Sequence, residues 1–149
     1  MPFVLTRQFR KVLGGSAAWS PTPCSAPWRG LFQRFIIGSP ALWWNNRVIF
    51  KSEESFAASG NVLPARVFFS VGLLEQRLAP TYPMVTDLQA FTGTLKRRQY
   101  KGLEWEAHVF DDETHISVVP ATISRGLRFI YPTAAPNPPL QPTAEKRGG

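Results

Sequence analysis

The sequence predicts an α/β fold in which parallel strands form a sheet and helices pack on its faces. From residue 66 on, apolar patterns follow in the order strand, helix, strand, loop, helix, which is a βαβα unit. The predicted strands are short β-branched and aromatic runs, whereas the segment between them repeats its apolar residues at helical spacing. With 149 residues, 44% of them hydrophobic, the chain is large enough for one domain with a buried core.

Short elements are expected before residue 66. The apolar run 35–38 ends at Ser39-Pro40 and predicts a buried strand. Residues 42–46 contain Trp43, Trp44 and two asparagines, and we expect them on a loop. A short amphipathic segment is predicted over 48–56.

The second half has clearer patterns. Residues 66–71 (RVFFSV) predict a strand that Gly72 stops. A helix is predicted from Pro83, with basic residues at its C-terminal end, where they suit the helix dipole, and Gly102 as its terminator. One apolar stripe runs along this helix: Met84, Leu88, Phe91 and Leu95.

The last elements are a strand, a loop and a helix. Over 103–110, Trp105, Ala107 and Val109 alternate with Glu104, Glu106 and His108, which predicts a strand. The polar residues 111–115 predict a loop. Pro120 is expected to open the final helix, with Ile123, Leu127 and Ile130 on one face.

Charge and composition exclude several classes of protein. The net charge of +7 comes entirely from the acid-free segment before Glu53, which suits a nucleic acid, an anionic surface or a transit peptide. No dense Lys/Arg cluster appears, so nucleic acid is not an expected partner. No apolar run approaches the ~20 residues of a membrane span, and no secretory signal is evident, so we expect a cytoplasmic protein.

The single cysteine, Cys24, excludes a disulfide scaffold and, with only two histidines, a zinc site. We therefore expect no cofactor and no metal. The sequence makes no prediction about the oligomeric state.

Two polar residues follow predicted strands, at the edge where functional residues gather in open α/β sheets. Glu75 lies beyond the strand that ends at Val71, and His115 lies beyond the strand that ends near Phe110. Acid followed by histidine is the chain order of hydrolases in which a carboxylate orients an imidazole base. The alternative is that both are ordinary loop residues without a catalytic role.

Three stretches resemble one known family: GLFQRFIIGSPALWWNNRVIF, RVFFSVGLLE and GLEWEAHVFDDETHISVVPATISRGLRFIY. Over residues 30–131 the chain resembles the C-terminal part of the putative-esterase family of α/β-hydrolases, which includes esterase D-like and enterochelin-esterase-like siderophore hydrolases. The resemblance implies a partial α/β-hydrolase, whose parallel sheet lacks its N-terminal strands and has flanking helices. It also implies that His115 is the general base and that the region of Glu75 supplies the acid.

Other site residues follow from the same resemblance. Asp87 and Asp111 are alternative acids, because the position of the family's acid varies. Trp43 and Trp44 would line the substrate pocket, or else serve in plain packing.

The nucleophile region departs from the family pattern. A Gly-x-Ser-x-Gly turn and a helix should stand here, and only Gly14, Ser16 and Ala18 imitate the spacing. Three prolines at 21, 23 and 27 follow, and each costs a helix interior about 3 kcal/mol. We therefore expect residues 1–29 to be a degenerate, irregular segment, and residues 132–149 to be a disordered Pro-rich tail.

A shift of reading frame would explain this departure. Read one base earlier, and with suitable third bases, codons for residues 16–25 permit Phe-Gly-Gly-Leu-Val-Ala-Tyr-Thr-Leu-Phe, which fits the family's helix start. The gene's nucleotide sequence decides this hypothesis.

The expected function is hydrolysis of a carboxylic ester, either a siderophore or a small acyl ester, through a serine nucleophile. Ser16 is the candidate nucleophile, with truncation and impaired catalysis expected. The alternatives are an inactive fragment and a basic binding protein without enzymatic activity.

Overall fold

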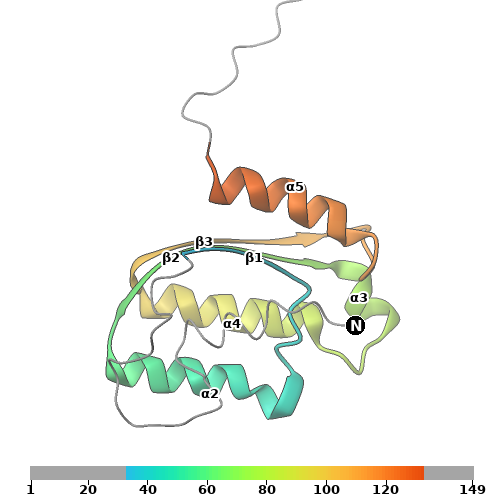
Figure 1. The fold of residues 1–149 in the computed structure, drawn as a ribbon. Coiled ribbons are helices and arrows are strands. Elements are labelled where there is room, and N and C mark those ends of the chain that lie inside the picture. The colour runs from blue at the N-terminus through green and yellow to red at the C-terminus, as the bar shows by residue number, and fades with distance from the viewer. Residues whose placement is uncertain (1–32, 133–149) are drawn as a thin grey trace, which may run out of the picture.

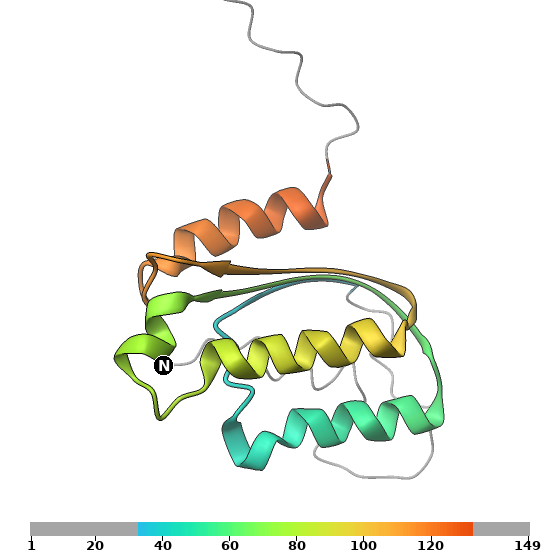
Figure 2. The same cartoon turned by 180° about the vertical axis from the view of Figure 1, so that it is seen from behind.

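The computed structural model describes residues 33–132, which form three layers (Figures 1 and 2). One sheet has the strand order β1-β2-β3, and both strand pairs are parallel. Helices α2 and α4 lie on one face of the sheet, and α5 lies on the other. The predicted parallel sheet with flanking helices is therefore confirmed. In chain order the elements are β1 (Arg34–Gly38), α2 (Trp44–Ser59), β2 (Val62–Gly72), α3 (Leu73–Leu78), α4 (Met84–Arg98), β3 (Lys101–Phe110) and α5 (Val118–Ile130).

The main core lies between β2 and α4. Val67, Phe69 and Val71 alternate along the central strand, and all three are buried on the face that α4 covers. The apolar stripe predicted for α4 is confirmed, because Met84, Leu88, Phe91 and Leu95 all belong to this core. Burial of these side chains holds α4 against the sheet, and it therefore sets the position of α4 relative to the carboxyl end of β2.

Strand β3 confirms most of its predicted alternation. Trp105 and Val109 pack against the core, whereas Glu104 and Glu106 are exposed. Ala107 is also exposed, although it was expected on the apolar side. Strand β3 is the last strand of the described sheet, so its side chains have fewer neighbours than those of β2.

The predicted end of α4 was wrong. The helix ends at Arg98, and Gln99 adopts a left-handed conformation in which its N–H donates to the Leu95 carbonyl. Gly102 instead lies inside β3 with a φ of +82°, and a Cβ there would come within 3.2 Å of the Pro64 Cα. Gly102 is therefore needed where β3 passes close to an irregular part of β2.

Helix α2 begins with an unusual turn. Asn45, Asn46 and Arg47 all have left-handed dihedral angles, with φ between 50° and 57°. The loop predicted over 42–46 is thus a turn followed by this left-handed segment, and the amphipathic segment predicted over 48–56 lies in the regular part of α2. Asparagine tolerates the left-handed region, and Arg47 is held there by an ion pair with Asp87.

The predicted apolar face of α5 was wrong for two of its three residues. Ile130 is buried, but Ile123 and Leu127 are 49% and 46% exposed. The helix instead turns small residues toward the sheet, where Thr122 bonds the Ser70 hydroxyl at 2.7 Å and Gly126 faces Ile36. Small side chains occupy the middle of this face because they allow the helix to approach the sheet closely. Pro120 does not open α5 but lies in its first turn, where a missing N–H costs no helical bond.

The close approach at Gly126 gives a stability prediction. In a Gly126→Ala variant the new Cβ would lie 2.7–2.9 Å from three Ile36 side-chain atoms, so we expect a loss of about 1–3 kcal/mol in the free energy of unfolding. Gly93→Ala in α4 is the matched control, because a Cβ there would lie 3.7 Å from the flexible end of the Arg97 side chain. That variant should gain roughly 0.5–1 kcal/mol from helix propensity. Urea unfolding of both variants measures the difference, and equal shifts would contradict the packing described here.

A buried carboxylate joins α2 to the start of β3. Glu53 is 2% exposed, and it accepts hydrogen bonds from the Arg98 guanidinium at 3.0 Å and from the Tyr100 hydroxyl. Burial, followed by the hydrogen bond to Glu53, raises the pKa of Tyr100 above its ordinary value. This cluster lies at the end of the sheet opposite to the carboxyl ends of the strands, and it fixes α2 relative to α4.

Candidate functional site

Glu75 lies where the sequence placed it, just beyond the carboxyl end of β2, but on a short helix that was not predicted. Helix α3 starts directly after β2, and Glu75 is its third residue. Its carboxylate turns back to accept the Gly72 N–H at 2.7 Å, which caps the helix. The side chain is only 2% exposed, so its oxygens bond protein groups and not bulk water.

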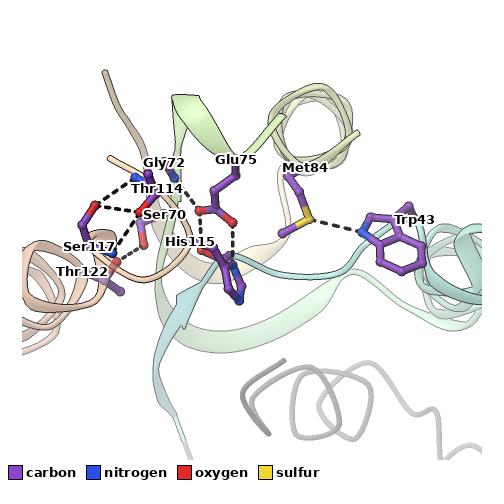
Figure 3. Close-up of polar contacts among 10 residues, drawn as sticks. Trp43, Ser70, Gly72, Glu75, Met84, Thr114, His115, Ser117 and Thr122 are labelled. Carbon is purple, nitrogen blue, oxygen red and sulfur yellow. Dashed lines mark hydrogen bonds and ion pairs between the residues drawn. The ribbon is translucent and has the colours of Figure 1, made fainter. Parts of the chain in front are cut away.

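His115 lies on the predicted loop after β3, and that loop is anchored on α3. The Leu74 N–H donates to the Glu113 carbonyl at 3.1 Å, and the Thr114 N–H donates to the Ser117 hydroxyl at 2.9 Å. These bonds bring the imidazole over Glu75, and its Nδ1 lies 2.7 Å from Glu75 Oε2 (Figure 3). The His115 side chain is 51% exposed. The structure thus brings together the acid and the base predicted from the sequence, 40 residues apart.

Ser39 is a third residue of this site, and it was not among the residues predicted from the sequence. Ser39, at the carboxyl end of β1, donates a hydrogen bond from its hydroxyl to Glu75 Oε1 at 2.6 Å. In the sequence, its Gly-Ser-Pro segment contributes only to the family resemblance. The available signal was a polar residue directly after a strand, the same signal that selected Glu75 and His115. That signal does not by itself place Ser39 near Glu75, because nothing in the local sequence shows that β1 and β2 are neighbours.

The order of these contacts determines their chemistry. The Glu75 carboxylate lies between Ser39 and His115, so the Ser39 hydroxyl bonds the acid and not the imidazole. Ser39 is therefore not placed as a nucleophile, because activation requires a hydroxyl next to the base. With Nδ1–H donating to the carboxylate, the remaining nitrogen of His115, Nε2, is free to accept a proton. The arrangement can orient a neutral imidazole and stabilise its cation.

The alternative acids and the candidate nucleophile are not placed beside the Glu75–His115 pair in the described structure. Asp87 is fully buried, and it pairs with Arg47 at 2.6 Å and not with His115. Asp111 is exposed on the turn after β3. Ser16, like the whole predicted segment 1–29 and the tail from residue 133 on, lies outside the described residues.

The two tryptophans have different surroundings. Trp43 is half-buried, donates its indole N–H to the Met84 sulfur at 3.2 Å and contacts the Tyr82 ring at 4.9 Å between centroids. Trp44 is 53% exposed. In Figure 3, Trp43 and Met84 lie to the side of the Glu75–His115 pair. Packing on α4 accounts for the position of Trp43, and a role of either tryptophan in substrate binding stays a prediction.

The described residues contain neither a metal-binding cluster nor a membrane-spanning helix. Within 33–132, no three His, Cys, Asp or Glu side chains gather as they would around a metal ion. In the same part of the chain, no helix has the length and apolar character that crossing a membrane requires.

Comparison with known proteins agrees with the motifs. No family model matches the chain. It is 33% identical, over 100 residues, to the ferri-bacillibactin esterase BesA of Bacillus subtilis. Among solved structures it is similar to the siderophore hydrolase EstA of Aspergillus nidulans, with a TM-score of 0.60 and 23% identity over 66% of this chain and 38% of EstA. It is also similar to the BES protein of Bacillus cereus, with a TM-score of 0.50 and 32% identity over 62% of this chain and 34% of that protein.

These matches confirm the predicted resemblance to siderophore esterases, together with the α/β-hydrolase character of the fold. They are partial. The alignment with BesA covers 66% of this chain but only 34% of BesA, so the chain spans about a third of the length of this curated relative.

Proposed function

We propose that this chain carries the base and the acid of an ester hydrolase active site, and that its substrates are siderophore esters or small acyl esters. The observation that carries the proposal is the 2.7 Å contact between His115 Nδ1 and Glu75 Oε2 at the carboxyl edge of a parallel sheet. A buried carboxylate that orients a half-exposed imidazole is the arrangement that a serine hydrolase needs. The similarity to siderophore esterases supports the substrate class.

In the proposed mechanism, His115 Nε2 takes the proton of a serine hydroxyl as that oxygen attacks the ester carbonyl. The Glu75 carboxylate stabilises the imidazolium that forms. The alcohol then leaves with the proton from Nε2, and an acyl-serine remains. Water then attacks the acyl carbon while the same nitrogen takes its proton, the carboxylic acid leaves, and the serine oxygen recovers the proton from Nε2.

We assign the nucleophile to Ser16, and we propose that turnover is impaired. The support for both points is in the sequence: Gly14, Ser16 and Ala18 have nucleophile-like spacing, but prolines at 21, 23 and 27 oppose the helix that should follow. That helix would normally support the site for the developing oxyanion. Trp43 and Trp44 are proposed to contact the substrate, and Trp44 is exposed enough to do so. A cytoplasmic location is part of the same proposal.

An assay with p-nitrophenyl butyrate tests this function. We expect slow turnover by the full chain and a loss of at least roughly 10⁴-fold in His115→Ala, because the base acts in both chemical steps. His108→Ala is the matched control, since His108 lies within β3 against Phe110 and should leave turnover unchanged. Turnover that survives in His115→Ala would contradict the proposal.

A Ser16→Ala variant tests the nucleophile separately. If turnover persists in Ser16→Ala but not in His115→Ala, then the assignment of Ser16 is wrong and the base is right. A well-folded chain without any turnover would favour the basic binding protein, and salt-sensitive retention on DNA would support that alternative. An aggregated or molten sample would favour the inactive fragment.

A further inference from the structure

We infer that Ser39 is a positioning residue, which holds the Glu75 carboxylate in the orientation that bonds His115. The inference rests on the proposed function only for its kinetic consequence, because the positioning itself is a property of the folded chain. It starts from the way in which the hydrogen bonds divide between the two carboxylate oxygens. Oε1 accepts from the Ser39 hydroxyl and the Gly72 N–H, whereas Oε2 faces His115.

The two donors on Oε1 restrain different motions. Gly72 is the last residue of β2, three residues before Glu75, and caps the helix that carries Glu75, so this bond is local to one segment of the chain. Ser39 comes from β1, 36 residues away in the chain. Of the two, therefore, only the Ser39 bond fixes the carboxylate relative to a different strand of the sheet.

Ser39 is itself firmly held. Its N–H donates to the Ser70 carbonyl at 2.7 Å, which ties its backbone to the central strand. The residue is buried, with 8% exposed, so water does not compete well for its hydroxyl. Its φ of 45° lies in the left-handed region, which is costly for a residue with a Cβ. A glycine would adopt this conformation more easily, but it would lack the hydroxyl group that reaches Glu75.

These hydrogen bonds connect three segments of the chain in series. The end of β1 holds the acid on α3, and the acid holds the imidazole on the loop after β3. If the Ser39 hydroxyl is removed, Oε1 keeps a single donor and the buried carboxylate has an unfilled bonding position. The carboxylate then turns or admits water, and its bond to His115 Nδ1–H opens more often.

Hydrogen exchange of the His115 Nδ1 proton measures that opening without any substrate. The full chain, labelled with ¹⁵N, is compared with Ser39→Ala, Ser39→Gly and the control Ser70→Ala by nuclear magnetic resonance. Ser70 is a suitable control because it is also a buried serine beside β1, but its hydroxyl bonds Thr122 and not Glu75. The chain has two histidines, so a His108→Gln variant assigns the signals.

We expect exchange of the His115 proton to become about tenfold faster in both Ser39 variants, the factor that the loss of one ordinary hydrogen bond produces. Ser39→Gly relieves the left-handed strain, so the same acceleration in that variant excludes backbone strain as its cause. The control should exchange like the unmodified chain. Equal exchange rates in the Ser39 variants and the unmodified chain would overturn the inference, as would equal acceleration in Ser70→Ala.

Ester turnover separates this inference from the proposed function. If the chain hydrolyses p-nitrophenyl butyrate, Ser39→Ala should lower kcat with little change of KM, since Ser39 does not reach the substrate. A loss confined to KM would contradict a positioning role. If the unmodified chain has no turnover but the exchange result holds, the proposed function fails while the positioning of Glu75 by Ser39 stands.

Discussion

Replacing Glu75 by glutamine should lower ester turnover by roughly 10⁴-fold, the magnitude known for carboxylate-to-amide changes in Ser-His-Asp triads. The carboxylate accepts from His115 Nδ1 at 2.7 Å and is almost completely buried, so it orients the imidazole directly. An amide at the same position can turn its NH₂ group toward Nδ1. The imidazole then carries its proton on Nε2 and no longer acts as a base there. The measurement is kcat with p-nitrophenyl butyrate, together with circular dichroism to verify the fold.

Asp111→Asn is the matched control for this prediction. Asp111 is a nearby carboxylate on the exposed turn after β3, and the sequence alone left it as an alternative acid. We expect Asp111→Asn to leave turnover unchanged. A larger loss in Asp111→Asn than in Glu75→Gln would reassign the acid and contradict the geometry described above.

The second large effect, on both stability and the site, is expected from Gly72→Ala at the junction of β2 and α3. A Cβ at this position would lie 2.2 Å from the carbonyl oxygen of Glu113 and 2.7 Å from its carbonyl carbon. Gly72 has an ordinary φ of −82°, so the glycine is required here for space and not for its conformational freedom. The atoms in the way belong to backbone, which cannot rotate aside as the end of a side chain can. The loop after β3 must therefore move away from α3.

This movement should disrupt both the fold and the site. The Leu74 N–H loses the Glu113 carbonyl, and His115, two residues further along the loop, moves away from Glu75. We expect the free energy of unfolding to fall by about 3 kcal/mol, at the upper end for added volume in a packed region. The His115 Nδ1 proton should also exchange faster than in the unmodified chain. Urea unfolding and nuclear magnetic resonance measure the two effects.

Gly60→Ala provides the comparison for this second prediction. Gly60 lies after α2, and a Cβ there meets no atom within 4 Å. Its expected change in unfolding free energy is within about 0.5 kcal/mol, as for most surface substitutions. If Gly72→Ala were as mild as Gly60→Ala, the loop would not pass over α3 as described.

The buried residues could be predicted where the local pattern of apolar residues decides which side of a helix or strand is buried. The stripe from Met84 to Leu95 was predicted from helical spacing, since one face of that helix has a sheet to cover. For α5 the same reasoning failed, because close contact with the sheet favours Thr122 and Gly126 over the larger Ile123. Local hydrophobicity does not reveal how closely two elements approach one another.

The sequence by itself determined the α/β class, the order of the elements from residue 66 on except for the short helix α3, and the candidate pair Glu75 and His115. These conclusions depend on periodicity and on short motifs, which are local properties of the chain. The tertiary structure alone decided that Ser39 bonds the acid and that Asp87 pairs elsewhere. It also decided which face of α5 is buried. The reason is that these features depend on contacts between segments about 36 to 90 residues apart, whose distances are set only when strands pair and helices pack.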